Sequence, residues 1–464
     1  MITLENRFFP LRSAVCFCIE GGIILASVVA SFSLLHKTGD AGTIGFQDAI
    51  ARGVVVAFFY QTCMYLLDMY DLKHSQTWGE LIFSLVLAVG FVCIGIGLVT
   101  YVVPGFGVKG AMYYLTILFA AIFLLIWRMV FAIYLTRFAS KENILVMGTG
   151  EPARLVGEEI LKRERLGFRL VGFVGDTEDG NPHAVGKARI LGDYSQVAEL
   201  VHANRVRRLV VAFSERRGGY PVDSLLDLRV KGCYVTEWAS FFEKLSGRIP
   251  IDNLSPSYFI FQDGFRKSTS ILYFRRIVSL SFAAGLLLLL FPLLLFIAFL
   301  VKVDSQGPVF YTQKRVGKKG KIFDIIKFRS MRKDAEENGR PQWAVRNDPR
   351  VTRVGKYIRA TRLDELPQLI NVLRGDLDMV GPRPERPEFV EELNKVIPYY
   401  TLRDTVKPGL TGWAQVMFPY SGTIEESKDK LQYDLFYIKN MSVKLDFLIL
   451  FKTVKIVLLG RGAI

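Results

Sequence analysis

Four long apolar runs within the first 140 residues limit what this chain can fold into. They cover approximately residues 14–35, 53–67, 81–103 and 111–135. The third run carries no charge over 23 residues, and about 20 apolar residues are enough for a helix to cross a bilayer. Single charges interrupt the first and fourth runs, at Glu20 and Arg128. We therefore expect residues 1–140 to form a bundle of four transmembrane helices.

The rest of the chain is too polar to lie in a membrane. Charged residues make up 22% of the sequence, although its mean hydropathy of +0.28 is too high for a disordered or an ordinary soluble chain. Lysine and arginine outnumber acidic residues by 59 to 44, a net charge of +15. Such a surplus suits anionic lipids, phosphorylated substrates or nucleic acid, but no nucleic-acid reading motif is present. We expect a membrane-associated multidomain protein without a nucleic-acid partner.

Residues 141–247 have the pattern of a Rossmann-like α/β domain. Apolar stretches such as ILVM and RLVVAF alternate with helix-like stretches, as in a parallel sheet with crossover helices. The turn GTGEPA contains Gly148 and Gly150 and could hold a pyrophosphate at a helix N-terminus, with Asp176 as the ribose partner. This motif alone is not specific. A structural or regulatory role, including formation of a homo-oligomer, is therefore the preferred hypothesis for this module.

Cysteine and histidine are both absent after Cys233. This excludes His-based triads and thiolate or imidazole metal sites from the C-terminal half. Chemistry there must use carboxylates, lysine, arginine or hydroxyl groups, and the oxygen ligands among these also suit a hard cation.

The densest group of charged residues in that half is RATRLDELPQLINVLRGDLDMVGPR, residues 359–383. Asp364 and Glu365 precede LPQLINVLRG, which predicts a helix ending at Gly375. A helix N-terminus stabilises carboxylates and phosphates alike. Two carboxylates among arginines suit phosphoryl transfer, in which one carboxylate attacks phosphorus or holds Mg²⁺. Helix capping by the same two acids is the alternative.

Four sequence blocks point to one family. KRVGKKGKIFDIIKFRSM, TRLDELPQLINVLRGDLDMVGPRP, KPGLTGWAQV and NMSVKLDF, in this order, resemble the bacterial polyprenyl-phosphate sugar-1-phosphate transferases, the monotopic phosphoglycosyl transferases. The resemblance covers residues 273–464, and the layout resembles the long form of the family, which includes undecaprenyl-phosphate glucose or galactose phosphotransferases. It implies transfer of sugar 1-phosphate from a UDP-sugar to undecaprenyl phosphate, with release of UMP, at the start of exopolysaccharide, capsule or O-antigen synthesis.

The resemblance also implies roles for single residues. Asp364 would be the nucleophile and would carry the sugar phosphate as an acyl phosphate in a ping-pong reaction. Glu365 would act in acid–base chemistry or, together with Asp364, in holding Mg²⁺. The residues that match binding sites for the substrate or its phosphates are Lys327, Arg359, Arg383 and Asp446.

The sequence departs from the family after WAQV. Many members continue with Asn-Gly-Arg, and here Pro419 stands at the position of that arginine, which assists the nucleotide. The sugar and nucleotide preference therefore stay open. The departure also leaves a second hypothesis, a non-catalytic membrane nucleotide sensor or polysaccharide-assembly scaffold. The complete set of charged residues from Lys327 to Asp446 favours the enzyme.

A fifth apolar run, residues 277–301, contains Pro292 and has basic residues at both ends. Its length alone predicts a spanning helix, but that would separate the C-terminal region from cytosolic UDP-sugars. Proline interrupts helical hydrogen bonding, and in the family a reentrant helix is broken at a proline-containing motif. After a linker at 248–272, we expect a reentrant membrane helix at 273–302, kinked near Pro292. A mainly helical catalytic domain at 303–464 would follow, on the cytoplasmic face of the bacterial inner membrane.

Overall fold

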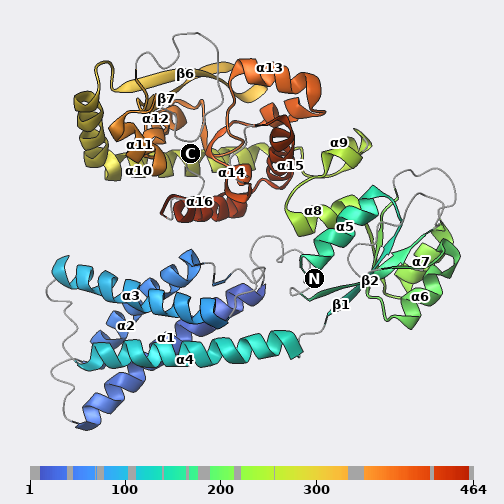
Figure 1. Ribbon diagram of the computed structural model, residues 1–464, viewed down its shortest axis with the longest axis horizontal. Helices are drawn as coiled ribbons and strands as arrows, with labels where there is room; N and C mark the ends of the chain where they lie inside the picture. Colours follow the sequence, from blue (N-terminus) through green and yellow to red (C-terminus); the bar gives the residue numbers. More distant parts are fainter. Residues whose placement is uncertain are drawn as a thin grey trace. The chain divides into compact units, whose positions relative to one another are not determined.

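The computed structural model describes residues 11–38, 45–67, 69–70, 78–102, 111–137, 141–163, 167–175, 189–213, 221–254, 256–332, 350–418 and 423–458. The chain divides into two compact units, Met1–Trp238 and Ala239–Ile464. Figure 1 labels the helices and strands of both units.

The apolar runs of the first unit are helical. They form α1 (Leu11–Thr38), α2 (Phe46–Leu66), α3 (Trp78–Val102) and α4 (Ala111–Arg137). By length and composition each contains a stretch able to cross a membrane. Apolar side chains from these helices, among them Tyr60, Val92 and Leu124, pack into a shared core. Long apolar N-terminal helices are thus confirmed.

The two charges that interrupt the apolar runs form one buried ion pair. Nε of Arg128 on α4 lies 2.5 Å from Oε1 of Glu20 on α1, and Nη1 of Arg128 donates to the carbonyl of Met69 at 2.6 Å. Both side chains are buried. Isolated charges are expensive in an apolar interior, so each is tolerated here because the other neutralises it. The pair fixes α1 against α4 in one register.

The second part of this unit is the expected parallel sheet. Its order is β3-β2-β1-β4-β5, and every neighbouring pair is parallel. The strands are β1 (Glu142–Met147), β2 (Phe168–Val174), β3 (Ile190–Gly192), β4 (Arg208–Val211) and β5 (Tyr234–Glu237), with helices α5 (Glu151–Leu161), α6 (Val197–Ala203) and α7 (Val222–Val230). Strand β1 is central, and its residues 144–147 are fully buried, as expected for a continuous apolar strand covered on both faces.

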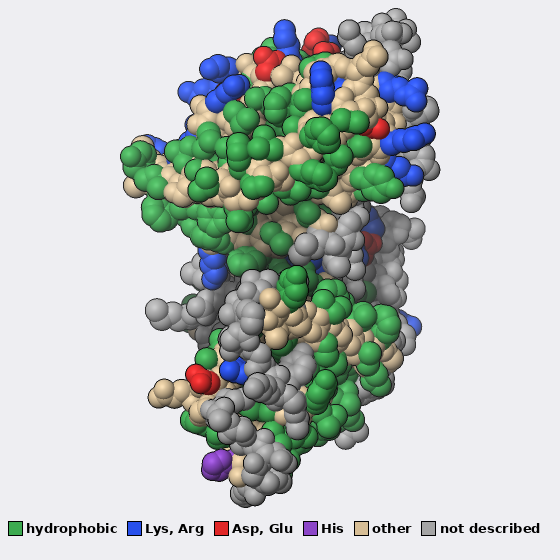
Figure 2. Space-filling view, turned by 90° about the vertical axis from the view of Figure 1, so that its left-hand side faces the viewer, with side chains coloured by type: hydrophobic (Ala, Val, Ile, Leu, Met, Phe, Trp, Pro, Cys, Tyr) green, Lys and Arg blue, Asp and Glu red, His purple; other side chains and the backbone are tan. Residues whose placement is uncertain are grey.

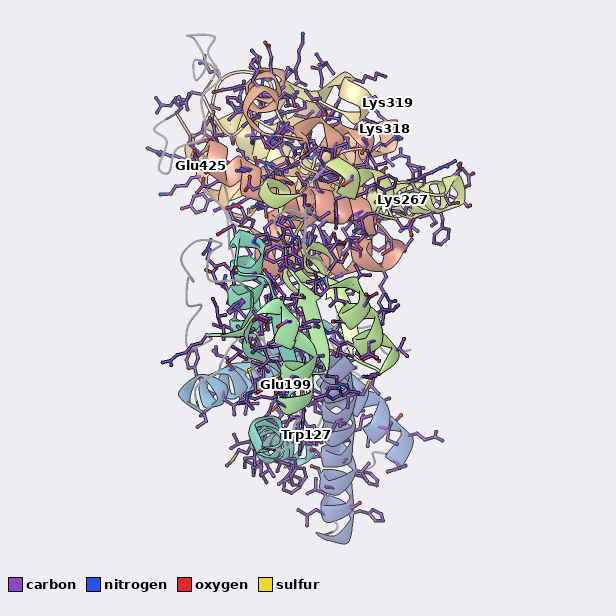
Figure 3. All side chains as sticks on the ribbon, turned by 90° about the vertical axis from the view of Figure 1, so that its right-hand side faces the viewer. Trp127, Glu199, Lys267, Lys318, Lys319 and Glu425 are labelled. Carbon is purple, nitrogen blue, oxygen red and sulfur yellow. The ribbon has the colours of Figure 1, made fainter. Side chains whose placement is uncertain are left out.

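The C-terminal unit is mainly helical, also as expected. Its helices are α8 (Trp238–Ser246), α9 (Pro256–Phe261), α10 (Thr269–Asp304), α11 (Arg353–Ala360), α12 (Gln368–Arg374), α13 (Pro387–Val396), α14 (Trp413–Met417), α15 (Ile424–Asn440) and α16 (Val443–Leu458). Strands β6 (Phe310–Val316) and β7 (Ile322–Phe328) form an antiparallel hairpin. Strands β8 (Asp378–Val380) and β9 (Gly409–Thr411) form a short parallel pair. The turn between β6 and β7 exposes Lys318 and Lys319 (Figure 3).

Residues 239–262, which the sequence suggested as the end of the Rossmann-like domain and a linker, pack within the C-terminal unit. The ammonium of Lys439 on α15 donates to Glu243 of α8 at 2.6 Å and to the hydroxyl of Tyr258 on α9 at 2.8 Å. The indole of Trp413 donates to the carbonyl of Gly247 at 2.8 Å. Composition could not reveal this boundary because the contacts join residues far apart in the chain.

Helix α10 has 36 residues and includes Pro292. A straight helix of this length would measure about 54 Å. In Figure 1 the helix bends before it reaches β6, and its two ends contact the same unit: Ser279 accepts a hydrogen bond from the backbone N–H of Met379, and Ile297 packs with Phe328. The middle is exposed and apolar, with Leu288 80% exposed.

The Glu20–Arg128 pair provides a test of the helical bundle. Glu20→Ala or Arg128→Ala leaves one buried charge without its partner and should lower the free energy of unfolding by about 3–5 kcal/mol. The charge-exchanged double variant Glu20→Arg with Arg128→Glu should recover a large part of that loss. Unfolding in detergent measures the change.

The control is Asp48→Asn, which alters an exposed carboxylate on α2 and should have little effect. Single variants that unfold at the same point as the unchanged protein would contradict the role given to the pair.

Candidate active site

The two adjacent acids lie at the start of a helix, as their sequence position predicted. Asp364 and Glu365 belong to a short 3-10 helix, Leu363–Glu365, that leads into α12. Arg362, just before it, has a left-handed backbone with φ of 54°. The chain turns sharply at this residue, so it leaves α11 and enters α12 within a few positions, and both carboxylates lie at the turn.

Glu365 joins three parts of the chain through one carboxylate. Its Oε1 accepts hydrogen bonds from Lys327 Nζ of β7 at 2.8 Å and from Arg383 Nη2, in the loop after β8, at 2.7 Å. Burial alone would raise the pKa of Glu365, but the charges and hydrogen bonds of Arg383 and Lys327 outweigh burial and hold that pKa well below its ordinary value. Glu365 is therefore anionic, and it fixes both cations beside the turn.

Asp364 has a different environment from its neighbour. It accepts no hydrogen bond from any residue within the ranges that the structure describes. Burial and the adjacent negative charge of Glu365 raise the pKa of Asp364 to about 6, although Lys327, Arg359 and Arg383 oppose the shift. Among the described residues, Asp364 is thus a carboxylate without a hydrogen-bond donor in a cationic surround, which is suited to attack on phosphorus or to cation binding.

Asn371 holds the helix after the acids against the strand that supplies Lys327. Its side-chain oxygen accepts a hydrogen bond from the backbone N–H of Ile326 at 3.0 Å, and its amide donates to the carbonyl of Asp324 at 2.8 Å. The fully buried amide thus satisfies one donor and one acceptor on β7. The distance between Lys327 and Glu365 depends on this contact between α12 and β7.

A second layer of ion pairs supports the loop of Arg383. Arg403 donates to the backbone carbonyl of Arg383 at 2.7 Å and pairs with Asp434 at 3.1 Å. Glu385, two residues after Arg383, accepts from Lys430 at 2.7 Å. Sequence reasoning missed Asn371, Arg403, Glu385 and Asp434. The sequence offered a signal for two of them, because Asn371 lies inside the block TRLDELPQLINVLRGDLDMVGPRP and Glu385 directly follows it.

The remaining expected site residues of the C-terminal unit lie in two places. Arg359 is on α11, close enough for its charge to lower the pKa of Asp364. Asp446 lies in a buried cluster with Arg275 and Tyr437, at 2.6 Å and 2.9 Å. Pro419 is outside the described residues.

The Gly turn of the Rossmann-like domain has local structural reasons for its sequence. Gly148 has φ of +128°, and a Cβ there would lie 2.3 Å from the carbonyl oxygen of Ala212. Gly150 is the N-cap of α5, and Glu151 in the first turn pairs with Arg154. Asp176 is outside the described residues. The turn thus needs glycine at position 148 for packing, and nucleotide binding there stays a hypothesis.

Within the described ranges, no group of three or more His, Cys, Asp or Glu side chains is arranged to hold a metal ion. Mg²⁺ usually needs only one or two carboxylates, completed by water and substrate phosphates. Asp364 offers both of its oxygens, and Glu365 Oε2 has one long contact, 3.4 Å from Arg383 Nη1. The pair therefore fits such a cation only in the presence of a phosphorylated substrate.

Comparison with known proteins agrees with this geometry. Residues 270–460 match the bacterial sugar transferase family, and residues 65–227 match a CoA-binding domain. The chain is 43% identical over 221 residues to the UDP-N-acetylgalactosamine-undecaprenyl-phosphate N-acetylgalactosaminephosphotransferase of Aeromonas hydrophila, covering 48% of this chain and 51% of that protein.

Two further relatives match over a longer region. A UDP-glucose:undecaprenyl-phosphate glucose-1-phosphate transferase of Escherichia coli is 34% identical, covering 68% of this chain and 67% of the relative. An undecaprenyl-phosphate galactose phosphotransferase of Salmonella typhimurium is 31% identical, covering 70% and 69%. The chain thus spans between about half and about two thirds of these relatives. From the family match and these identities, the chain belongs to the bacterial sugar transferase family.

Proposed function

We propose that this protein transfers sugar 1-phosphate from a UDP-sugar to undecaprenyl phosphate and releases UMP, the first step of exopolysaccharide, capsule or O-antigen synthesis. The observation that carries the proposal is the pair of adjacent carboxyl groups before α12, in which Glu365 holds Lys327 and Arg383 by hydrogen bonds while their charges and that of Arg359 act on Asp364. The named activities of the relatives support the same reaction. A sensor or scaffold would not need this arrangement.

The proposed reaction has two steps on Asp364. A carboxylate oxygen attacks the β-phosphorus of the UDP-sugar, a bond from Asp364 to phosphorus forms, and the bond to UMP breaks. A phosphate oxygen of undecaprenyl phosphate then attacks the same phosphorus and releases the free carboxylate. Lys327, Arg359 and Arg383 stabilise the negative charge on the phosphoryl oxygens. Glu365 keeps Lys327 and Arg383 in place, and it stays anionic because both of them pair with it.

Asp364 and Glu365 Oε2, with substrate phosphate oxygens, would hold Mg²⁺, which when bound lowers the charge of the diphosphate. Lys327 and Arg383 would orient Glu365 in both steps. Lys327 and Arg383 remain on Glu365 Oε1, so they limit which of its oxygens faces the substrate.

We also propose that α10 is a reentrant helix, which its bend supports, and that the catalytic domain lies on the cytoplasmic face of a bacterial inner membrane. Figure 2 shows a broad apolar surface on the C-terminal unit, in the upper part of the view. Large apolar side chains near the bend are exposed, including Leu288, Leu289 and Phe291. Such a surface is stable in lipid and unfavourable in water.

Asp364→Asn should abolish transfer because it removes the nucleophile. The protein should stay folded because the side chain of Asp364 accepts no hydrogen bond from a described residue. Loss of a nucleophile lowers turnover by about 10⁴–10⁶-fold in other covalent enzymes. UMP release by the purified protein from a panel of UDP-sugars, with undecaprenyl phosphate and Mg²⁺, measures the effect. Glu391→Gln, on an exposed carboxylate, is the matched control.

If the Asp364→Asn protein forms product at the rate of the control, Asp364 is not the nucleophile. A second readout is mass spectrometry of the unchanged protein after reaction with the UDP-sugar alone. The sugar phosphate should be found on residue 364.

Lys327→Met should lower kcat about 10²-fold, the size of effect seen when one donor to a developing oxyanion is removed. The variant removes one of two cations from Glu365 and one positive charge near Asp364. Lys395→Met, on an exposed lysine of α13, should leave kcat unchanged. Equal rates for the two variants would show that Lys327 does not act on the reaction.

Cysteine labelling tests the reentrant topology. In a background without the native cysteines, Lys162→Cys in the first unit and Lys319→Cys in the second place exposed thiols before and after α10. A reentrant helix predicts that both react only after the inner membrane is permeabilised. Reaction of residue 319 alone in intact spheroplasts would establish a spanning helix instead.

A further inference from the structure

The membrane helix α10 is attached to the catalytic domain by two consecutive arginines in its first turns. Arg275 is only 5% exposed. Its Nε donates to Asp446 Oδ2 on α16 at 2.6 Å, and its Nη2 donates to the carbonyl of Val380 at 3.3 Å and to the hydroxyl of Tyr437. One guanidinium thus joins α10 to β8, α15 and α16.

Arg276 attaches the same turn of α10 to the helix that follows the two acids. Its Nη2 donates to the carbonyl of Val372 at 2.7 Å, in the last turn of α12. Its Nη1 donates to the carbonyl of Leu377 at 3.0 Å and pairs with Asp378 at 3.1 Å. A cation at a helix C-terminus satisfies carbonyls that have no partner within the helix.

The other end of α10 is held in a similar way. Arg329, which follows β7, donates to the carbonyl of Ser305 at 2.6 Å and to that of Val301 at 3.3 Å. Between the two attachments lies the apolar bend around Pro292. The ends of the membrane helix are therefore fixed to the catalytic domain, and only its middle projects from the domain.

Both arginines of the first attachment contact segments that lead to the active-site residues. Arg276 contacts one end of α12, and Asp364 and Glu365 lie at its other end. Arg275 contacts the carbonyl of Val380, three residues before Arg383. A shift of α10 relative to α12 or β8 would therefore change the height of the carboxylates above the lipid surface.

Both oxygens of Asp446 accept hydrogen bonds from side chains of the domain, which favours a structural role for this residue. Its Oδ2 accepts from Arg275, its Oδ1 accepts from Tyr437 at 2.9 Å, and the residue is buried. A buried ion pair often adds little stability compared with apolar residues of the same size, because desolvation offsets the attraction. We therefore infer that the ion pair between Arg275 and Asp446 serves to select one arrangement of α10 on the domain.

We propose that Arg275, Arg276 and Asp446 form a clamp that sets the depth of the active site for the lipid acceptor, so that Asp446 is a positioning residue and not a phosphate ligand. The inference rests on the proposed function. A UDP-sugar reaches the site from water at any depth of the domain. The phosphate of a polyprenyl phosphate is confined to the headgroup plane, so a displaced active site loses the lipid step selectively.

The test compares kcat/KM for undecaprenyl phosphate with kcat/KM for the UDP-sugar, using the full chain in lipid nanodiscs. An inactive or unfolded fraction lowers both values by the same factor and leaves their ratio unchanged. The variants are Asp446→Asn, which keeps the shape and removes the charge, and Arg275→Lys, which keeps the charge and loses the branched contacts. Glu391→Gln, in the exposed pair with Lys395, is the control.

For Asp446→Asn and Arg275→Lys the ratio should fall about tenfold or more, since displacement by about 1 Å can cost about 10²-fold in rate. The control should keep the ratio of the unchanged protein. An unchanged ratio in both clamp variants, or a selective loss of kcat/KM for the UDP-sugar, would overturn the clamp. Absence of UMP-releasing transfer in the unchanged protein would instead count against the proposed function.

Discussion

The candidate active site depends on one carboxylate that is shared by two cations. Lys327, Glu365 and Arg383 come from β7, the turn before α12 and the loop after β8, and the two hydrogen bonds to Glu365 Oε1 bring these segments together. Without Glu365, two positive charges would face each other in a partly buried place. With it, the group keeps a net positive charge toward Asp364, whose carboxylate makes no hydrogen bond with the described residues. The chemistry proposed for Asp364 requires both conditions.

Buried ion pairs also connect other segments that lie far apart in the chain. Glu20 with Arg128 joins α1 to α4, Glu243 with Lys439 joins α8 to α15, and Asp434 with Arg403 supports the loop of Arg383. Each pair is buried, so desolvation consumes a large share of the attraction and leaves little net stability. Each pair also leaves a bare charge if the segments separate or slide. These contacts therefore specify position more than they add stability.

The positions of Arg275 and Asp446 give this idea a functional consequence. The proposed chemistry takes place on the C-terminal unit, and one proposed substrate is confined to the membrane surface. The membrane helix is fixed to α12 and β8 through Arg275 and Arg276, and α12 continues directly from the two acids. The contacts of Arg275 and Arg276 thus join the helix proposed to lie in the membrane to the segments proposed to carry out catalysis.

The sequence alone determined the classes of structure and the place of the two acids before a helix. Apolar run length predicts the helices of residues 11–137 because a helix needs a fixed number of apolar residues to cross lipid. Strand and helix alternation predicts the parallel sheet. The position of Asp364 and Glu365 before a helix follows from local capping preferences and a proline.

Only the tertiary structure decided which charges meet. Arg128 and Glu20, or Arg275 and Asp446, are separated by more than a hundred residues, and no local rule pairs them. It also assigned residues 239–262 to the C-terminal unit through Lys439, and it placed Asp446 beneath Arg275. Local preferences act over a few residues along the chain, whereas charge pairing acts through space and depends on where the whole fold brings each segment.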